Sequence, residues 1–494
     1  MYHTRQEIPL SVNAVIIMHL HPPSYLDLPA LFFERVLPTP VVQPSFVVLN
    51  RPLAGELGCR FEDLESPEIL TVLSGGRSPH GSIPLALAYA GHQFGQFVPV
   101  LGDGRAVLLG EVVAIDGASF DVQLKGSGQT PFSRRGDGRA ALGPMLREYI
   151  IGEALHALGI PATRTLAVVS TGEVVMRERP LPGGIQVRIA QSHVRIGTFQ
   201  FAAMHGDRES LSALADYVIR RHYQAIGGQE DRWYQLARSI IERQAALIAQ
   251  WMCVGFIHGV MNTDNVAVSG ESIDFGPCAW MNRYDPATVF SSIDRGGRYA
   301  FGAQPRIIQW NSARLVEALV PLLDRERERA IALAQGLVDE VPGIYAEYWL
   351  RGMRAKIGLK SVEEGDASLI SDLLEIMRQA RLDYTGTFRS LSDDEGNIRS
   401  PALASWMIRW RERTRSERNG RAFWETLADM RQINPAVIAR NHLVEEALRK
   451  GAEEGDFSLM TRLVAAVRDP FTEDAEFGAV PAGDDPDYRT FCGT

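Results

Sequence analysis

The pattern of apolar and polar positions divides the chain into a strand-rich part and a helix-rich part. Residues 105–114 are rich in aliphatic and β-branched side chains, and residues 119–125 alternate apolar with polar side chains, as half-buried strands do. The Asp116-Gly117 turn lies between them, which predicts a hairpin. Further strand-like segments cover 165–170, 174–177 and 185–190. They predict that the hairpin belongs to a larger antiparallel sheet.

One helix interrupts these strands, and many helices follow them. Gly143-Pro144, apolar residues spaced by three and four, and Gly159-Ile160-Pro161 mark the start, the buried face and the end of the first helix. From about residue 208 helical periodicity dominates, and a long helix with one apolar stripe is predicted over about 231–254. The other predicted helices lie at about 312–324, 326–340, 366–381, 402–415, 419–431, 441–454 and 457–468.

These elements predict an α+β protein with a β-rich N-lobe, a helical C-lobe and a nucleotide in the cleft between the two lobes. The expected division is an irregular segment over 1–50, the N-lobe over 51–205, the C-lobe over 206–400, a helical extension over 401–472 and an acidic tail over 473–494.

Composition narrows the class of partner. The 494 residues carry 51 basic and 60 acidic side chains, a net charge of −9, which argues against a protein that grips nucleic acid through its phosphates. Between residues 125 and 195, however, ten basic side chains face five acidic ones. A basic zone of this size suits a nucleoside triphosphate, and a solvated basic face is the alternative.

Neither a signal peptide nor an apolar segment of membrane-spanning length is recognisable, so we expect a cytoplasmic protein without a membrane partner. The four cysteines form no CxxC pair, which argues against a zinc site and fits a reducing compartment. Cys492 is the third residue from the chain end, where a thiol is expected to be exposed.

The most informative motif is His258-Gly-Val-Met-Asn-Thr-Asp-Asn265, followed by Asp274-Phe-Gly276. Kinase-like enzymes combine a catalytic loop that ends in a metal-binding Asn with an Asp-Phe-Gly whose Asp holds magnesium. Asn265 and Asp274 are therefore predicted metal ligands. Val260 occupies the position of the kinase base and cannot accept a proton. Asp264 is the neighbouring carboxylate that could replace it; a turn-capping role for Asp264 and a dead kinase remain alternatives.

A second set of candidates lies among the predicted strands. Lys125 ends a strand and Glu148 lies in the following helix, which is the arrangement with which kinases hold phosphates. Gly126-Ser-Gly128 and Arg135-Gly-Asp-Gly-Arg139 follow Lys125, and glycines let backbone N–H groups approach a phosphate. Arg188 and Arg195 could clamp phosphate oxygens in the same cleft. For each residue, a solvated side chain or an ordinary turn is the alternative.

With these motifs the chain closely resembles the selenoprotein O family, the protein adenylyltransferases that are called YdiU-like in bacteria. The resemblance covers about residues 45–470 and is carried by Tyr89-Ala-Gly-His-Gln-Phe-Gly-Gln96, Leu101-Gly-Asp-Gly-Arg105, Gln123-Leu-Lys-Gly-Ser-Gly-Gln-Thr-Pro-Phe-Ser-Arg134, Gly136-Asp-Gly-Arg139, Arg147-Glu-Tyr149, residues 258–265, Asp274-Phe-Gly-Pro277, Asn434-Pro435 and Arg440-Asn-His-Leu-Val-Glu445.

The resemblance implies a protein-kinase-like, two-lobed fold in which ATP lies reversed, so that AMP passes to Ser, Thr or Tyr hydroxyls of proteins and pyrophosphate leaves. It implies Mg²⁺, or Mn²⁺, on Asn265 and Asp274, and Asp264 as the proton acceptor. The residues implied to bind the nucleotide are Gly102, Gly104, Arg105, Lys125, Asp137, Gly138, Arg188, Arg195 and Asp274. Transfer of UMP from UTP, an orthodox kinase and a non-catalytic nucleotide-binding scaffold are the rival interpretations.

The resemblance also bears on redox control. Some relatives carry a selenocysteine or a cysteine near the C-terminus, and in some the tail cysteine bridges to a cysteine after Asp-Phe-Gly. The residue of this chain that aligns with that partner is Phe290, so Cys278 is the candidate partner of Cys492.

Overall fold

The computed structural model describes residues 20–79, 81–393, 400–417, 421–481 and 488–491. Its centre is a seven-stranded antiparallel sheet with the strand order β1-β3-β6-β7-β9-β8-β2. The strands are β1 (Phe33–Arg35), β2 (Ser45–Leu49), β3 (Leu85–Leu87), β6 (Ala106–Val113), β7 (Ser119–Lys125), β8 (Arg164–Met176) and β9 (Pro180–Ala190). The chain is thus of mixed α+β class, as predicted.

Alternation along the central strands gives the sheet two differently covered faces. Val122 and Leu124 of β7 join a buried cluster that contains Leu53 and Leu73, so one face packs on α1 (Arg51–Glu56) and α3 (Pro67–Leu73), near α2 (Phe61–Leu64). The other face is covered by α4 (Leu142–Ala157), which packs against β8 and β9. Residues 123 and 125 therefore point to the side of α4.

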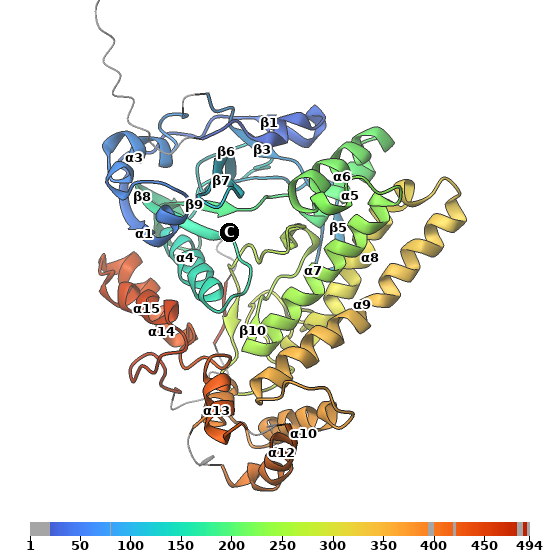
Figure 1. The fold of residues 1–494 in the computed structure, drawn as a ribbon. Helices are drawn as coiled ribbons and strands as arrows, with labels where there is room; N and C mark the ends of the chain where they lie inside the picture. The colour runs from blue at the N-terminus through green and yellow to red at the C-terminus, as the bar shows by residue number, and fades with distance from the viewer. Residues whose placement is uncertain (1–19, 80, 394–399, 418–420, 482–487, 492–494) are drawn as a thin grey trace, which may run out of the picture.

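Helices make up most of the rest of the chain. Figure 1 shows α7, α8 and α9 packed side by side, with α10, α12 and α13 below them and α14 and α15 returning to α4. The helices are α5 (Ile196–His205), α6 (Arg208–His222), α7 (Arg232–Val254), α8 (Gln304–Leu323), α9 (Arg327–Lys356), α10 (Asp366–Gln379), α11 (Tyr384–Ser390), α12 (Ala404–Glu417), α13 (Phe423–Arg431), α14 (Asn441–Arg449) and α15 (Ser458–Arg468). Among the described residues, no helix combines the length and the apolar character needed to cross a membrane.

Two short hairpins complete the structure near the site described below. β4 (Gly91–Gln93) pairs with β5 (Gln96–Val98), and β10 (Phe256–Ile257) pairs with β11 (Ala279–Trp280). The segment between β10 and β11 forms single bridges to other parts of the chain, Ala267 to Arg195 and Ser272 to Ala162, so neighbouring segments satisfy its backbone groups.

Candidate active site

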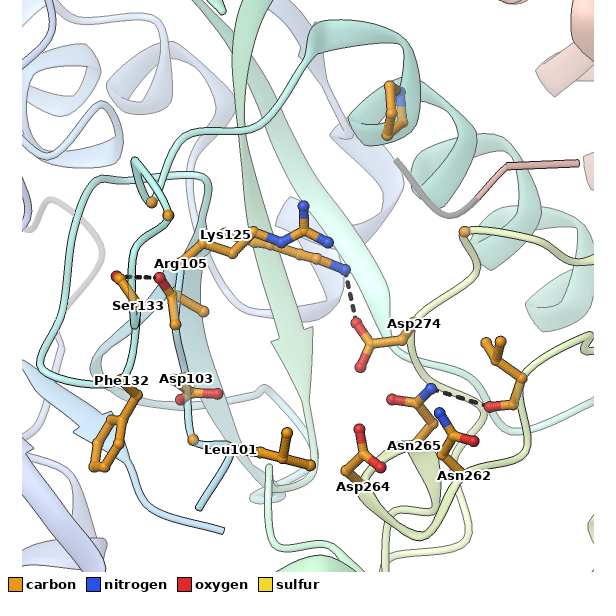
Figure 2. Close-up of a pocket in the computed structure, with 18 of the residues that line it drawn as sticks. Leu101, Asp103, Arg105, Lys125, Phe132, Ser133, Asn262, Asp264, Asn265 and Asp274 are labelled. Carbon is orange, nitrogen blue, oxygen red and sulfur yellow. Dashed lines mark hydrogen bonds and ion pairs between the residues drawn. The ribbon is translucent and has the colours of Figure 1, made fainter. Parts of the chain in front are cut away.

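A cleft with a volume of about 510 Å³ lies between the sheet, α4 and the segment that joins β10 to β11. It brings together residues that are far apart in the sequence, from Tyr89 to Ile293. Figure 2 shows Lys125 and Asp274 pointing toward one another, with Asp264 and Asn265 beside them. The cleft therefore unites the motifs that the sequence placed in two separate lobes.

The sheet register explains why two basic side chains enter the cleft from neighbouring strands. Gln123 of β7 lies opposite Arg188 of β9, and Lys125 lies opposite Gln186. All four side chains are on the face that α4 covers, whereas Leu124 and Val187 between them face the cluster under α1 and α3. The same strands thus build the core on one side and present charge on the other.

These bases meet two carboxylates in a buried ion-pair cluster. Lys125 Nζ pairs with Glu148 Oε1 at 2.5 Å and with Asp274 Oδ1 at 2.7 Å. Arg188 Nη2 lies 2.8 Å from Glu148 Oε2 and 2.8 Å from Asp274 Oδ1, and Arg195 Nη1 lies 2.7 Å from Asp274 Oδ2. Three cations and two anions leave the cluster with a net positive charge, which suits phosphate oxygens.

The cluster keeps both carboxylates ionised. Burial alone would raise the pKa of Asp274, but Lys125, Arg188 and Arg195 outweigh it and hold that pKa well below its ordinary value. Burial opposes ionisation of Glu148 as well, and Lys125 and Arg188 again lower its pKa. Asp274 also adopts a φ of 64°, in the left-handed region that few non-glycine residues occupy. Strain of this kind is concentrated at functional sites.

The loop before Asp274 carries a second carboxylate, that of Asp264, whose pKa is shifted in the opposite direction. Asp264 lies in a short 3₁₀ turn, Thr263–Asn265, and its side chain is buried. Its Oδ2 accepts a hydrogen bond of 3.2 Å from Gln93, while its Oδ1 has no hydrogen-bond partner among the described residues. Burial raises the pKa of Asp264 to about 6. A carboxylate with a free oxygen and a pKa near neutrality is suited to accept a proton.

The remaining loop residues fix this geometry. Asn265 donates a hydrogen bond of 3.0 Å from Nδ2 to the carbonyl oxygen of Val260. The amide nitrogen of Asn265 therefore holds the loop, and its amide oxygen takes no part in this bond. Val260 is itself buried, and its aliphatic side chain has no atom that could accept a proton. Arg195 donates from Nη1 both to the carbonyl oxygen of Asp264 and to Asp274 Oδ2, and so ties the two segments together.

The oxygen donors in the cleft fit a hard divalent cation that also binds phosphate. Among the described residues, no group of three or more His, Cys, Asp and Glu side chains is arranged to hold a metal ion. Asn265, which has an amide oxygen, and Asp274, which has a carboxylate, nevertheless both line the cleft. Magnesium is commonly held by one or two such ligands together with water and substrate phosphates.

Glycines allow close packing at the rim of the cleft. A Cβ at Gly102 would lie 2.2 Å from the ring of Phe132, and one at Gly138 would lie 2.1 Å from the backbone of Gly128. Gly104 and Arg105 also line the cleft. Asp137 lines it too, but its Oδ2 pairs with Arg177 at 2.9 Å.

Several residues of the site were not singled out from the sequence. Gln93 holds Asp264, and Tyr89 lies under the Arg195 guanidinium at 4.9 Å. Asp103 is buried between Gly102 and Gly104 and accepts hydrogen bonds from Leu87 N and Gln123 Nε2. The sequence pointed to these residues only because they lie inside the motifs 89–96 and 101–105. Their roles depend on contacts with residues that are distant in the sequence.

Of the two residues proposed for redox control, the structure describes Cys278. Cys278 is fully buried, donates from Sγ to the carbonyl oxygen of Phe275, and has its pKa raised to about 12, chiefly by burial. Cys492 lies outside the described residues. A bridge between them stays a prediction.

Comparison with known proteins gives one consistent result. Residues 16–468 match the family model described as "Protein adenylyltransferase SelO". The chain is 55% identical over 474 residues to the protein nucleotidyltransferase YdiU of Anoxybacillus flavithermus, covering 95% of this chain and 98% of that relative. It is 55% identical over 478 residues to the protein of the same name from Geobacillus kaustophilus, with 95% and 98% covered, and 52% identical over 485 residues to that of Rhizobium meliloti, again with 95% and 98% covered.

Proposed function

Because the chain belongs to the SelO family of protein adenylyltransferases, we propose that its cleft binds ATP with the α-phosphate exposed to attack. The chain is an enzyme, a nucleotidyltransferase. In the proposed reaction the oxygen of a Ser, Thr or Tyr hydroxyl on a protein bonds to the α-phosphorus. The bond from that phosphorus to the bridging oxygen breaks, AMP stays on the protein, and pyrophosphate leaves.

The observation that carries this proposal is the free oxygen of Asp264. Its Oδ1 is buried and has no hydrogen-bond partner within the described part of the chain, and Asp264 lines the same cleft as the cluster around Asp274. With a pKa of about 6, Asp264 is ionised at neutral pH and takes the proton of the attacking hydroxyl. An orthodox kinase reaction is disfavoured because the buried Val260 stands where the kinase base would be.

The basic side chains stabilise the charge that moves during transfer. Lys125, Arg188 and Arg195 converge on one carboxylate, Asp274, at 2.7–2.8 Å, and phosphate oxygens would be held by the same donors. The residues proposed to bind the nucleotide further out are Gly102, Gly104, Arg105, Asp137 and Gly138. Glu148 acts as a positioning residue because it holds Lys125 and Arg188 without being exposed itself.

A divalent cation completes the proposed site. Asn265 and Asp274 would hold Mg²⁺, or Mn²⁺, and the ion would neutralise phosphate charge. The proposal also includes a kinase-like, two-lobed architecture, with the β-rich lobe ending near residue 205 and the helical lobe following it.

Labelled nucleotides test the proposal directly. The full-length chain is incubated with Mg²⁺ and ATP labelled at the α- or the γ-phosphate, with the chain itself and a generic protein as acceptors. We expect label on protein from α-labelled ATP alone, and its loss in Asp264→Asn and Asp274→Ala. Asp339→Asn, a charge-neutralising change on the exposed side of α9, serves as the matched control.

Each other outcome has a distinct meaning. Label from γ-labelled ATP alone would establish a kinase and refute the role of Asp264. Stronger labelling from α-labelled UTP, with Mg²⁺ or with Mn²⁺, would make UMP the transferred group. If neither label is retained although ATP binds, the chain acts as a nucleotide-binding scaffold and the catalytic assignment falls.

A further inference from the structure

A second cavity lies away from the nucleotide cleft, and none of the described residues lines both. Its volume is about 630 Å³, against about 510 Å³ for the cleft. The walls come from α1, from the turn that joins β6 to β7, and from the end of α4 with the connection to β8. Figure 1 shows α1 and α4 close to β8.

The walls are mainly apolar and fixed in place. Leu53, Leu57, Ile160 and Ile189 each contribute, and each is only 3% exposed. Phe120 adds an aromatic ring. An apolar cavity of this size with a few polar groups is the usual form of a site for a small organic molecule.

One buried carboxylate faces this apolar space. Glu271 lines the cavity and is 5% exposed. Its Oε2 accepts hydrogen bonds from Ser269 Oγ at 2.8 Å and from Gln191 N at 2.9 Å. Its Oε1 accepts none from the described residues. Ser272, the next residue, is fixed by backbone hydrogen bonds of 2.9 Å to Pro161 and Thr163, so the carboxylate is held in position before any ligand arrives.

The charged side chains around the cavity favour a ligand that carries a positive rather than a negative charge. Glu56 and Asp116 line it together with Glu271. The guanidinium in the wall, Arg164, is already paired with Glu153 at 2.8 Å and with Glu56 at 2.7 Å. Because Arg164 also balances Glu56, an anionic ligand would meet the carboxylates of Asp116 and Glu271, whereas an N–H donor would complete the hydrogen bonding of Glu271.

We propose that this cavity is a second ligand site, which binds a small organic amine. The ammonium group donates to Glu271 Oε1, and the apolar body lies against Leu53, Leu57, Phe120 and Ile160. Burial raises the pKa of Glu271 to about 7, so a bound cation would favour its ionised form. The site does not depend on the proposed transfer reaction, because the two cavities have separate linings.

Matched probes test the charge and the place of binding. Tryptamine and the neutral tryptophol, which share an indole body, are titrated calorimetrically into the full chain with and without saturating ATP. We expect saturable binding of tryptamine, binding of tryptophol at least about tenfold weaker, and no displacement of tryptamine by ATP. The proposal would be overturned if tryptophol bound with the same affinity as tryptamine, or if ATP displaced tryptamine. It would also be overturned if tryptamine showed no saturable binding.

Two variants and a control locate the site. Glu271→Gln keeps an acceptor for Ser269 and Gln191 but loses the charge, so tryptamine should bind about tenfold more weakly. Ala162→Leu narrows the cavity and should weaken both probes. Glu178→Gln makes the same charge change at an exposed position outside the cavity and should alter neither. Unchanged tryptamine affinity in either Glu271→Gln or Ala162→Leu would refute the site.

Discussion

Asp264→Asn removes the charge of the buried carboxylate while keeping the shape of its side chain. An asparagine can still accept the hydrogen bond from Gln93, and its amide group takes the place of the oxygen that has no partner. Burial raises the pKa of Asp264 to about 6 from an ordinary value of 3.8. That separation means that ionising Asp264 costs the folded chain about 3 kcal/mol at neutral pH, so the variant should be more stable by about that amount.

The sign of the pH dependence distinguishes this cause from better packing. At about pH 4 Asp264 is protonated in the folded chain and still about half protonated in the unfolded chain, so wild type and variant should differ much less than at pH 8. As pH rises from about 4 to about 6, the unfolded chain has released this proton while the folded chain still holds it, so wild type loses stability relative to the variant. Above about pH 6 Asp264 is ionised in both states and the difference is constant. Denaturant unfolding at pH 4 and pH 8 measures it, with Asp339→Asn as the exposed control. A variant no more stable than wild type at pH 8, or equally stabilised at both pH values, would refute the reasoning.

Three further predictions concern the same cleft. Transfer should rise as pH increases through about 6, because Asp264 must lose its proton to act as a base, and initial rates across pH 5–8 check this. In Gly91→Ala the new Cβ would lie 2.6 Å from Asp264 Oδ1, so transfer should fall by about 100-fold while nucleotide affinity, measured by calorimetry, stays unchanged. Gly138→Ala should destabilise the chain by about 2 kcal/mol or more in denaturant unfolding, because its Cβ would meet the Gly128 backbone at 2.1 Å and its φ is +67°. Gly117→Ala, with φ +85° and no atom within 4 Å, should cost only the backbone strain; equal losses in the two glycine variants would contradict the packing argument.

The elements with strong local signals were predictable from sequence. β6, β7, α4 and α7 lie within a few residues of the predicted bounds, because alternation, capping glycines and apolar stripes act within each segment. The edge strands β1 and β2 were missed. They lie in a Pro-rich stretch, and only pairing with β3 and β8 makes them strands.

The predicted bounds of two helices were wrong where contacts between distant segments outweigh the local sequence pattern. The prediction ended one helix near residue 340, before Pro342, yet α9 continues to Lys356 with that proline inside it. Packing against α7 and α8 supports the longer helix. α8 begins at Gln304 rather than near 312, and the Gln304 side chain bonds to the backbone of Phe256 and His258. Such contacts cannot be read from periodicity.

The candidate site was predictable as a set of motifs but not as a network. Sequence indicated Lys125, Glu148 and Asp274, whose residue types suggest phosphate and metal binding. It could not indicate that Arg195 ties the Asp264 segment to Asp274, or that Gln93 reaches Asp264 from a hairpin. These contacts join residues more than sixty positions apart, so only the folded backbone brings them together.

The packing of α4 has a consequence for biosynthesis. Glu148 lies on this helix, which rests against α14 and α15, and its neighbour Arg147 pairs with Glu445. Glu445 also accepts a hydrogen bond of 2.7 Å from the hydroxyl of Tyr488. On the ribosome, the first half of the protein therefore emerges long before the segments that brace its central helix. The described residues that line the cleft end at Ile293, so they are all synthesised before the segments that support α4.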